Sequence, residues 1–181
     1  MDPGTISLDV AIENLRSSFV GITRLVTAAS YVIGIALIFR GVAMYRIFAN
    51  QTFGSAQRGE FAGPLVFLIV GAFLMYLPST LDTGLNTMYG NTELAAAGDL
   101  MSYQPLTARE NWNNLSDVLI SYVRLIGLIA FIRGLLILSK MGHPGSQPGS
   151  VAKGLTHLVG GILLINVVET VNILAATFGV S

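Results

Sequence analysis

The sequence predicts an all-α membrane protein: four long apolar helices arranged as two tandem repeated helical hairpins, preceded by an N-terminal amphipathic helix. The composition, the lengths of the apolar segments and the similarity of the two halves predict this class. Of 181 residues, 52% are hydrophobic and only 11% are charged, with a mean hydropathy of +0.67. A soluble domain carries about 25% charged residues, so lipid is the expected solvent for much of the chain.

The formal net charge is zero, which gives no electrostatic reason to expect nucleic acid as the main partner. Cysteine is absent, so disulfides and thiolate metal sites are excluded. Histidine occurs only at His143 and His157, without the spacing of a zinc site. No GxSxG nucleophile motif and no GxxxxGK[ST] phosphate loop is present. We therefore predict no catalytic residue, no metal and no cofactor other than bound phospholipid, and we do not expect an enzyme.

The first 18 residues predict a helix in the membrane interface. Apolar residues recur at helical spacing along one face of residues 8–19. The segment carries three acids and a single base, Arg16, so it lacks the basic region of a secretory signal peptide. The alternative is a frayed tail.

Four segments are apolar enough to cross a bilayer, which needs about 20 residues of helix. They run from Phe19 to Phe39, from Pro64 to Leu85, from Val118 to Leu138 and from Leu155 to Phe178. Pro78 lies inside the second segment, where neighbouring hydroxyl groups can bond the freed carbonyl. We therefore expect a kink there rather than a break.

The two halves of the chain resemble each other. The stretch "GIALIFRG" at residues 34–41 returns as "GLIAFIRG" at residues 127–134, a shift of 93 (127 − 34). The second and fourth apolar segments align at a shift of 90, which places Gly71 on Gly161 and Thr80 on Thr170. This self-similarity indicates a duplicated helix–loop–helix hairpin.

Charge then predicts the organisation and the topology. The predicted parts are an interfacial helix at 1–18, a first hairpin at 19–90 with a basic loop at 40–63, an acidic outer connection at 91–117, and a second hairpin at 118–181 with a basic loop at 133–154. Basic loops stay in the cytoplasm. Both loops are therefore expected inside, and the connection and both termini outside.

Four ionisable residues fall within or near the apolar segments. Two ion pairs are predicted from their depth, Arg24 with Asp82 and Arg124 with Glu169, because a lone charge in lipid is unfavourable. The alternative is that Arg24, Arg124 and Asp82 extend to the outer interface, which we favour for Asp82.

A family resemblance joins these observations. "VRLIGLIAFIRGLLILSK" at 123–140 and "GSQPGSVAKGLTHLVGGILLINVVETVNIL" at 145–174 resemble the IcmC/DotE proteins of type IVB secretion and the related TraQ proteins of conjugative plasmids. "FAGPLVFLIVGAFLMYLPSTLD" at 61–82 resembles the same family. The resemblance implies a small subunit of a secretion or conjugation apparatus in the bacterial inner membrane, without an enzymatic role.

The predicted topology is also similar to that of conjugative pilins, which are hairpins with both ends outside and a short basic loop inside. That similarity implies a homo-oligomer stacked into a helical, lipid-associated tube, present as an extracellular pilus after assembly. The basic residues expected to face lipid headgroups, the lumen and passing DNA or protein cargo are Arg40, Arg46, Arg58, Arg133, Lys140 and Lys153.

Two alternatives stay open. One is a static scaffold in the inner membrane, where the same charges only set the topology. The other is a small oligomeric channel or transporter, a class that commonly has broken helices at matching places in both repeats. Pro78 aligns with Val168 at the shift of 90, so a repeated break is not expected and this alternative is the weaker one.

Overall fold

The computed structural model describes residues 8–51, 62–90, 111–143 and 149–179, and every regular element in these ranges is helical. In chain order the elements are α1 (Leu8–Gln51), α2 (Ala62–Met75), α3 (Leu77–Tyr89), α5 (Asn111–Ser139), the short 3₁₀ helix η1 (Lys140–Gly142), α6 (Ser150–Ile165) and α7 (Val167–Thr177). The prediction of an all-α protein is confirmed.

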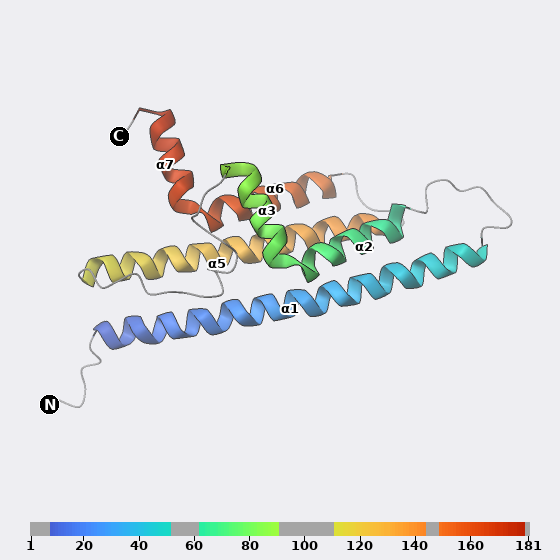
Figure 1. Ribbon diagram of the computed structural model, residues 1–181, viewed down its shortest axis with the longest axis horizontal. Coiled ribbons are helices and arrows are strands. Elements are labelled where there is room, and N and C mark those ends of the chain that lie inside the picture. Colours follow the sequence, from blue (N-terminus) through green and yellow to red (C-terminus); the bar gives the residue numbers. More distant parts are fainter. Residues whose placement is uncertain (1–7, 52–61, 91–110, 144–148, 180–181) are drawn as a thin grey trace.

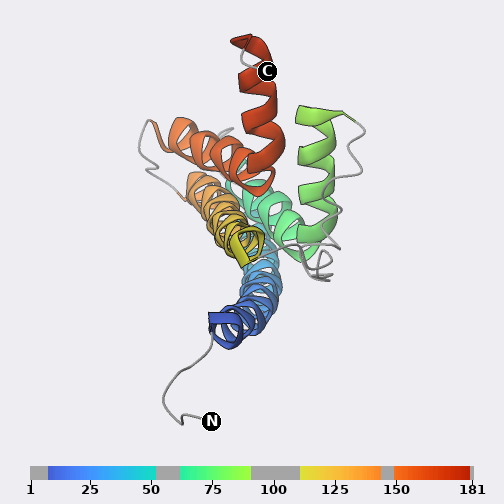
Figure 2. The same ribbon diagram turned by 90° about the vertical axis from the view of Figure 1, so that its left-hand side faces the viewer.

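Helices α1, α2, α5 and α6 run along the long axis of the molecule, and α3 and α7 stand across them (Figure 1). Seen from the end, α3 and α7 project to the same side, away from α1 (Figure 2). Helix α5 contacts α1, α2 and α6, so the core forms around it. The most deeply buried core side chains are Phe67, Leu74, Leu77, Leu81, Leu135 and Ile165.

The most extensive contacts join α1 to α2 and α5 to α6. In each pair, glycines allow the two backbones to touch. A Cβ atom added at Gly34 would lie 2.8 Å from the carbonyl oxygen of Gly71, and one added at Gly127 would lie 2.8 Å from that of Gly161. A side chain larger than hydrogen does not fit there without displacing backbone, so the close approach requires glycine.

A second contact repeats in the same way. A Cβ at Gly41 would meet the Leu68 side chain at 3.1 Å, and a Cβ at Gly134 would meet that of Leu158 at 2.9 Å. These residues are related by the shifts of 93 and 90 found in the sequence (134 − 41 and 158 − 68). The α1–α2 and α5–α6 pairs thus share the same packing register.

Gly161→Ala is expected to destabilise the α5–α6 pair, because the new Cβ would lie 2.7 Å from the backbone nitrogen of Phe131. Overpacking of this kind costs about 1–3 kcal/mol. Gly160→Ala is the matched control, since a Cβ there meets nothing within 4 Å. Thermal unfolding of the detergent-solubilised protein, followed by circular dichroism, measures both changes. Equal melting temperatures for the two variants would contradict the close packing.

The second and fourth apolar segments are each broken into two helices that meet at 91°. The breaks fall at Tyr76, between α2 and α3, and at Asn166, between α6 and α7, two residues related by the shift of 90. The expectation of a kink at Pro78 and of an unbroken fourth segment was therefore wrong. Proline is not the common cause, because the fourth segment has Val168 at the matching position.

A threonine hydroxyl contacts two backbone carbonyl groups at each break. Thr170 Oγ1 lies 3.0 Å from the carbonyl oxygen of Leu163 and 2.8 Å from that of Asn166. Thr80 makes the corresponding two contacts 90 residues earlier, at 3.1 and 3.0 Å. The Tyr89 hydroxyl is also 2.6 Å from Thr170 Oγ1, which joins α3 to α7. Hydroxyl hydrogen bonds therefore stabilise both bends.

Thr170→Val keeps the shape of the side chain but removes the hydroxyl, so we expect a loss of about 1–3 kcal/mol in the free energy of unfolding. Thr177→Val is the control, because the exposed Thr177 bonds only the Ile173 carbonyl of its own helix, at 2.7 Å. Its effect should stay within about 0.5 kcal/mol. Denaturant titration in detergent compares the variants, and a Thr170 effect no larger than the control would show that the bend does not need the hydroxyl.

Helix α1 is continuous over 44 residues, which corresponds to about 66 Å at 1.5 Å per residue. It joins the described part of the predicted interfacial segment to the first apolar segment without a break, and it continues past Arg40 to Gln51. The connection to α2 is therefore shorter than the predicted basic loop at 40–63. The connection predicted at 133–154 is shorter for the same reason, because α5 extends to Ser139 and α6 begins at Ser150.

By length and composition, two segments, Val10–Ile47 and Val118–Gly142, can each cross a membrane as single helices. Each bent pair adds one crossing if it spans as a unit, so the described residues provide between two and four crossings. The apolar helices indicate a membrane protein, but four straight spans are not what the chain forms.

Candidate functional site

Three of the six basic residues predicted to meet headgroups line one cavity. Arg133 on α5, Lys140 on η1 and Lys153 on α6 surround a partly open cavity of about 640 Å³, which we call the basic pocket. The other lining residues are Leu136, Ile137, Gly149 and Ser150. A cationic rim beside an apolar wall suits a ligand with an anionic head and an apolar remainder.

The close contact of α5 with α6 brings these cations together. Gly134, next to Arg133, packs against Gly154, next to Lys153, and a Cβ at Gly134 would lie 2.9 Å from the carbonyl oxygen of Gly154. Lys140 follows Arg133 by seven residues, about two helical turns, and therefore lies on the same side. Because the backbones touch at the glycines, the flanking cations are confined to one region.

The start of α6 closes one end of the basic pocket. Gly149 has a φ of +99°, a left-handed conformation that L side chains rarely adopt, and it turns the chain into α6. The first N–H groups of α6 have no side-chain cap, so they add partial positive charge at the same place. None of the described residues that line the cavity is acidic. The pocket is therefore suited to a phosphate or another anion.

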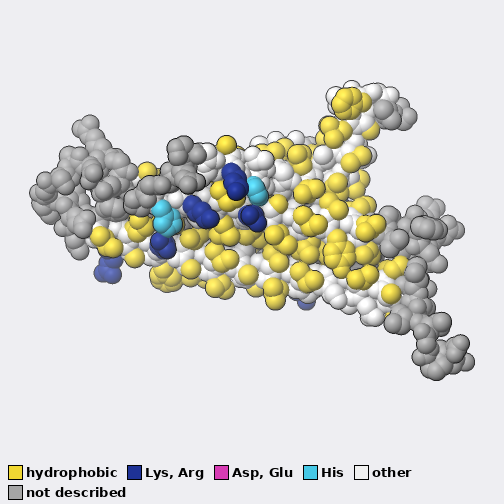
Figure 3. Space-filling model, turned by 180° about the vertical axis from the view of Figure 1, so that it is seen from behind, with side chains coloured by type: hydrophobic (Ala, Val, Ile, Leu, Met, Phe, Trp, Pro, Cys, Tyr) yellow, Lys and Arg dark blue, Asp and Glu magenta, His cyan; other side chains and the backbone are white. Residues whose placement is uncertain are grey.

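Charged side chains are distributed unevenly over the molecule. Lys, Arg and His side chains gather on one face among hydrophobic ones, and no Asp or Glu side chain is visible on that face (Figure 3). The two carboxylate side chains that the structure describes, those of Asp82 and Glu169, belong to the bent helices α3 and α7. The cationic surface is thus separate from the described carboxylates.

Arg40 is held by a contact between the two halves of the chain. Its Nη2 atom donates to Nε2 of His143 at 2.8 Å, since arginine has no acceptor. The guanidinium carbon lies 5.4 Å from the centre of the Phe67 ring, and the imidazole packs edge-on against that ring at 5.0 Å. Beside this cluster, a Cβ at Gly63 would lie 2.6 Å from the carbonyl oxygen of Gly142. These contacts fasten α1 and α2 to the end of α5.

The remaining two candidates do not line the basic pocket. Arg46 is exposed on α1. Arg58 lies outside the described residues. Of the six predicted residues, the structure therefore brings three together and binds a fourth, Arg40, to His143.

The predicted ion pairs involve four residues on four helices. Arg24 is exposed on α1 and Asp82 is half-buried on α3, and their pairing stays a prediction. Arg124 on α5 is half-buried, with its Nε atom buried and without a hydrogen-bond partner. Glu169 makes no hydrogen bond or ion pair within the described part of the chain. The pair between Arg124 and Glu169 is therefore not formed within one chain.

Sequence reasoning did not predict which cations would converge. A usable signal was present, because a basic residue directly precedes two of the contact glycines of the α5–α6 pair, as Arg133–Gly134 and Lys153–Gly154. The contact of Arg40 with His143 spans 103 residues and carries no such local signal.

Within the ranges that the structure describes, no group of three or more His, Cys, Asp or Glu residues could hold a metal ion. Comparisons of the chain with protein-family models, with curated proteins and with solved structures each found no match.

Removing a cation from the basic pocket is expected to weaken the binding of anionic lipid. Arg133→Gln, Lys140→Gln and Lys153→Gln each remove one charge, worth about 1 kcal/mol near an anionic surface, or about a fivefold loss of affinity. Native mass spectrometry of the detergent-solubilised protein with short-chain phosphatidylglycerol measures this. Arg46→Gln makes the same charge change outside the pocket and should have a smaller effect. Equal losses in all four variants would indicate general attraction rather than a site.

Proposed function

We propose that this chain is a non-enzymatic helical membrane subunit of a type IVB secretion or conjugation apparatus. In this proposal it assembles with copies of itself, in the manner of a pilin, and holds an anionic phospholipid headgroup in the basic pocket. The observation that carries the proposal is the convergence of Arg133, Lys140 and Lys153 on one cavity beside apolar helix faces. A phosphate bound there leaves its acyl chains against the apolar surface.

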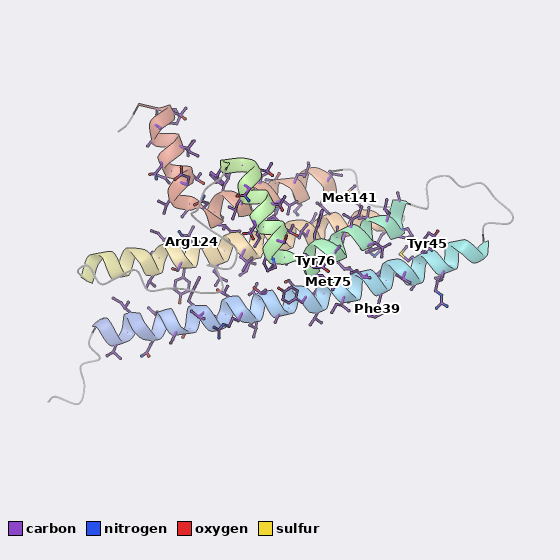
Figure 4. All side chains as sticks on the ribbon, viewed as in Figure 1. Phe39, Tyr45, Met75, Tyr76, Arg124 and Met141 are labelled. Carbon is purple, nitrogen blue, oxygen red and sulfur yellow. The ribbon has the colours of Figure 1, made fainter. Side chains whose placement is uncertain are left out.

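The outer surface of the helices supports a membrane location and assembly. Large apolar side chains are exposed on the long helices, including Leu25, Val32 and Phe39 on α1, Leu65 and Phe73 on α2, Leu119 and Ile126 on α5, and Val171 and Leu174 on α7. Phe39 points away from the other helices (Figure 4). Soluble monomers rarely expose so much apolar surface. Lipid tails and neighbouring subunits would cover it.

The proposed orientation places the basic pocket at the cytoplasmic side of the bacterial inner membrane, with both termini outside. It is supported by the contact of Arg40 with His143, which brings residues from both basic segments to the same end of the helices. Cations at one end of an apolar bundle attract the anionic cytoplasmic leaflet.

The proposed duplication is supported by the repeated glycine contacts and by the repeated breaks. A duplicated hairpin presents similar surfaces twice, and head-to-tail contacts between copies generate filaments when the rotation does not close. This favours pilin-like assembly over a static scaffold with the same topology.

A second candidate, a small oligomeric channel or transporter, is favoured by the breaks at Tyr76 and Asn166. Transporters commonly have broken helices at corresponding places of two repeats. The earlier objection, that the break is not repeated, no longer holds because both bends measure 91°. The location of the protein in the cell and the effect of its deletion on DNA or protein transfer therefore distinguish the two candidates.

Sheared surface filaments of producing cells are expected to contain this chain together with anionic phospholipid. Mass spectrometry of the purified filaments identifies both, and electron microscopy after gentle detergent extraction shows the oligomeric form. A chain confined to the inner membrane, with DNA or protein transfer lost on deletion, would identify a scaffold instead. Unchanged transfer after deletion would favour a channel or transporter, and lipid-free filaments would contradict the headgroup role of the basic pocket.

A further inference from the structure

The cations of the basic pocket are spread along the cavity and are not gathered at one point. Arg133 on α5 and Lys140 on η1 are seven residues apart, which corresponds to about 10 Å along the helix axis. Lys153 lies between these two levels, because a Cβ at the adjacent Gly154 would lie 2.7 Å from the side chain of Leu138. The pocket therefore has a cation at each end and a third cation between them.

The end of the pocket at Lys140 holds further donors. Helices α5 and α6 run side by side in opposite directions, so the start of α6 faces the end of α5 (Figure 1). Gly149 and Ser150, where α6 begins, line the cavity together with Lys140. The Ser150 hydroxyl and the first N–H groups of α6 can donate to an anion here. We call this group the outer end of the pocket and Arg133 the inner end.

The three cations are accessible and are not engaged elsewhere. Arg133, Lys140 and Lys153 are all exposed, and their side chains form no hydrogen bond or ion pair within the described residues. The cavity of about 640 Å³ lies in the range of pockets that hold whole small ligands, about 300–1,000 Å³. A single phosphate would fill only one end of it.

An exposed apolar surface leads away from the inner end. Ile126 and Ile129 precede Arg133 by seven and four residues, so they lie on the same face of α5. They are 57% and 45% exposed. Leu136 and Ile137 continue this face inside the pocket. Acyl chains can therefore extend from the inner end along Ile129 and Ile126, away from the outer end.

We propose that the basic pocket binds a membrane lipid whose head carries two phosphates. The inner phosphate, which links the head to the acyl chains, lies at Arg133. The outer phosphate, at the far end of the head, lies at Lys140 and Ser150, and Lys153 contacts both. This inference rests on the proposed function, which assigns an anionic phospholipid to the pocket, and it adds the chemical class of the head.

The charges support a head of this class. An inner phosphodiester carries one negative charge, and a terminal phosphate carries about 1.5 to 2 negative charges near pH 7. Together they nearly balance the three cations of the pocket. A lipid with a phosphodiester alone would leave two of the cations without a counter-charge. Two phosphates in one head also strengthen each other's binding, because the second then binds within the same molecule.

Two lipids that differ only in the outer phosphate test the proposal. Phosphatidylinositol 4-phosphate and phosphatidylinositol with the same acyl chains are compared by displacement of a labelled lipid from the detergent-solubilised protein. The wild type is expected to bind the first lipid at least about tenfold more tightly. In Lys140→Gln this preference should fall below about threefold, because the cation of the outer end is gone. Equal affinity of the wild type for the two lipids would overturn the proposal.

Two further variants serve as controls. Arg133→Gln should weaken the binding of both lipids and keep the preference, since both lipids carry the inner phosphate. Arg46→Gln makes the same charge change on an exposed part of α1 outside the pocket and should also keep it. Circular dichroism checks that every variant keeps its helical content. A preference lost equally in Lys140→Gln and Arg46→Gln would indicate general attraction and overturn the assignment of the outer end.

A soluble bisphosphate separates a lipid from a free ligand. Inositol 1,4-bisphosphate carries the same two phosphates without acyl chains, and it should bind at least about tenfold more weakly than the lipid because no apolar surface is buried. Replacing Ile126 and Ile129 together by Ser should weaken only the lipid. The control replaces Leu25 and Val32 of α1, which are 70% and 67% exposed, in the same way. Equal affinity for lipid and soluble bisphosphate would overturn the lipid assignment.

The outcomes also separate this inference from the proposed function. If the wild type binds both lipids equally and Arg133→Gln weakens both, the pocket holds a phospholipid head and only the two-phosphate assignment is overturned. If neither lipid binds, the headgroup role in the proposed function is contradicted together with the inference.

Discussion

Direct backbone contact between paired helices is the constraint on which this structure depends. In lipid the hydrophobic effect does not drive helices together, so close packing through small residues must do so. Gly34 with Gly71 and Gly127 with Gly161 provide that contact in the two pairs. The same register also determines the site, because the contact of Gly134 with its partner helix brings the neighbouring cations to one cavity. Helix packing and the position of the basic pocket therefore share one geometric cause.

The two helix pairs, α1–α2 and α5–α6, use this shared geometry differently. In the first half of the chain, the positions that match Lys140 and Lys153 are Ile47 and Gly63 (140 − 93 and 153 − 90). Gly63 instead allows the close approach of Gly142, and Arg40 beside it bonds His143. Three converging cations thus occur in the second half of the chain, while Arg40 of the first half makes the contact with His143 that joins the two halves.

Sequence patterns predicted the helix pairs better than they predicted the bends. Glycine spacing survives in the sequence because no other residue fits between touching backbones, so the shifts of 93 and 90 could be found by inspection. The break at Asn166 contains no proline. The hydroxyl of Thr170 bonds backbone carbonyl groups there and also contacts the hydroxyl of Tyr89 on α3. The charge pattern of the sequence identified the cations of the basic pocket. Their convergence depends on where the helices begin and end, which composition does not encode.

Helices α3 and α7 stand across the bundle and make its two sides different. We call the side that carries them the front and the opposite side the back. They project from one flank of the bundle, while the opposite flank is the long rod of α1 (Figure 2). Copies stacked front to back would all point the same way, so the resulting fibre would have two chemically distinct ends. In the proposed assembly, subunits would then join and leave those two ends at different rates.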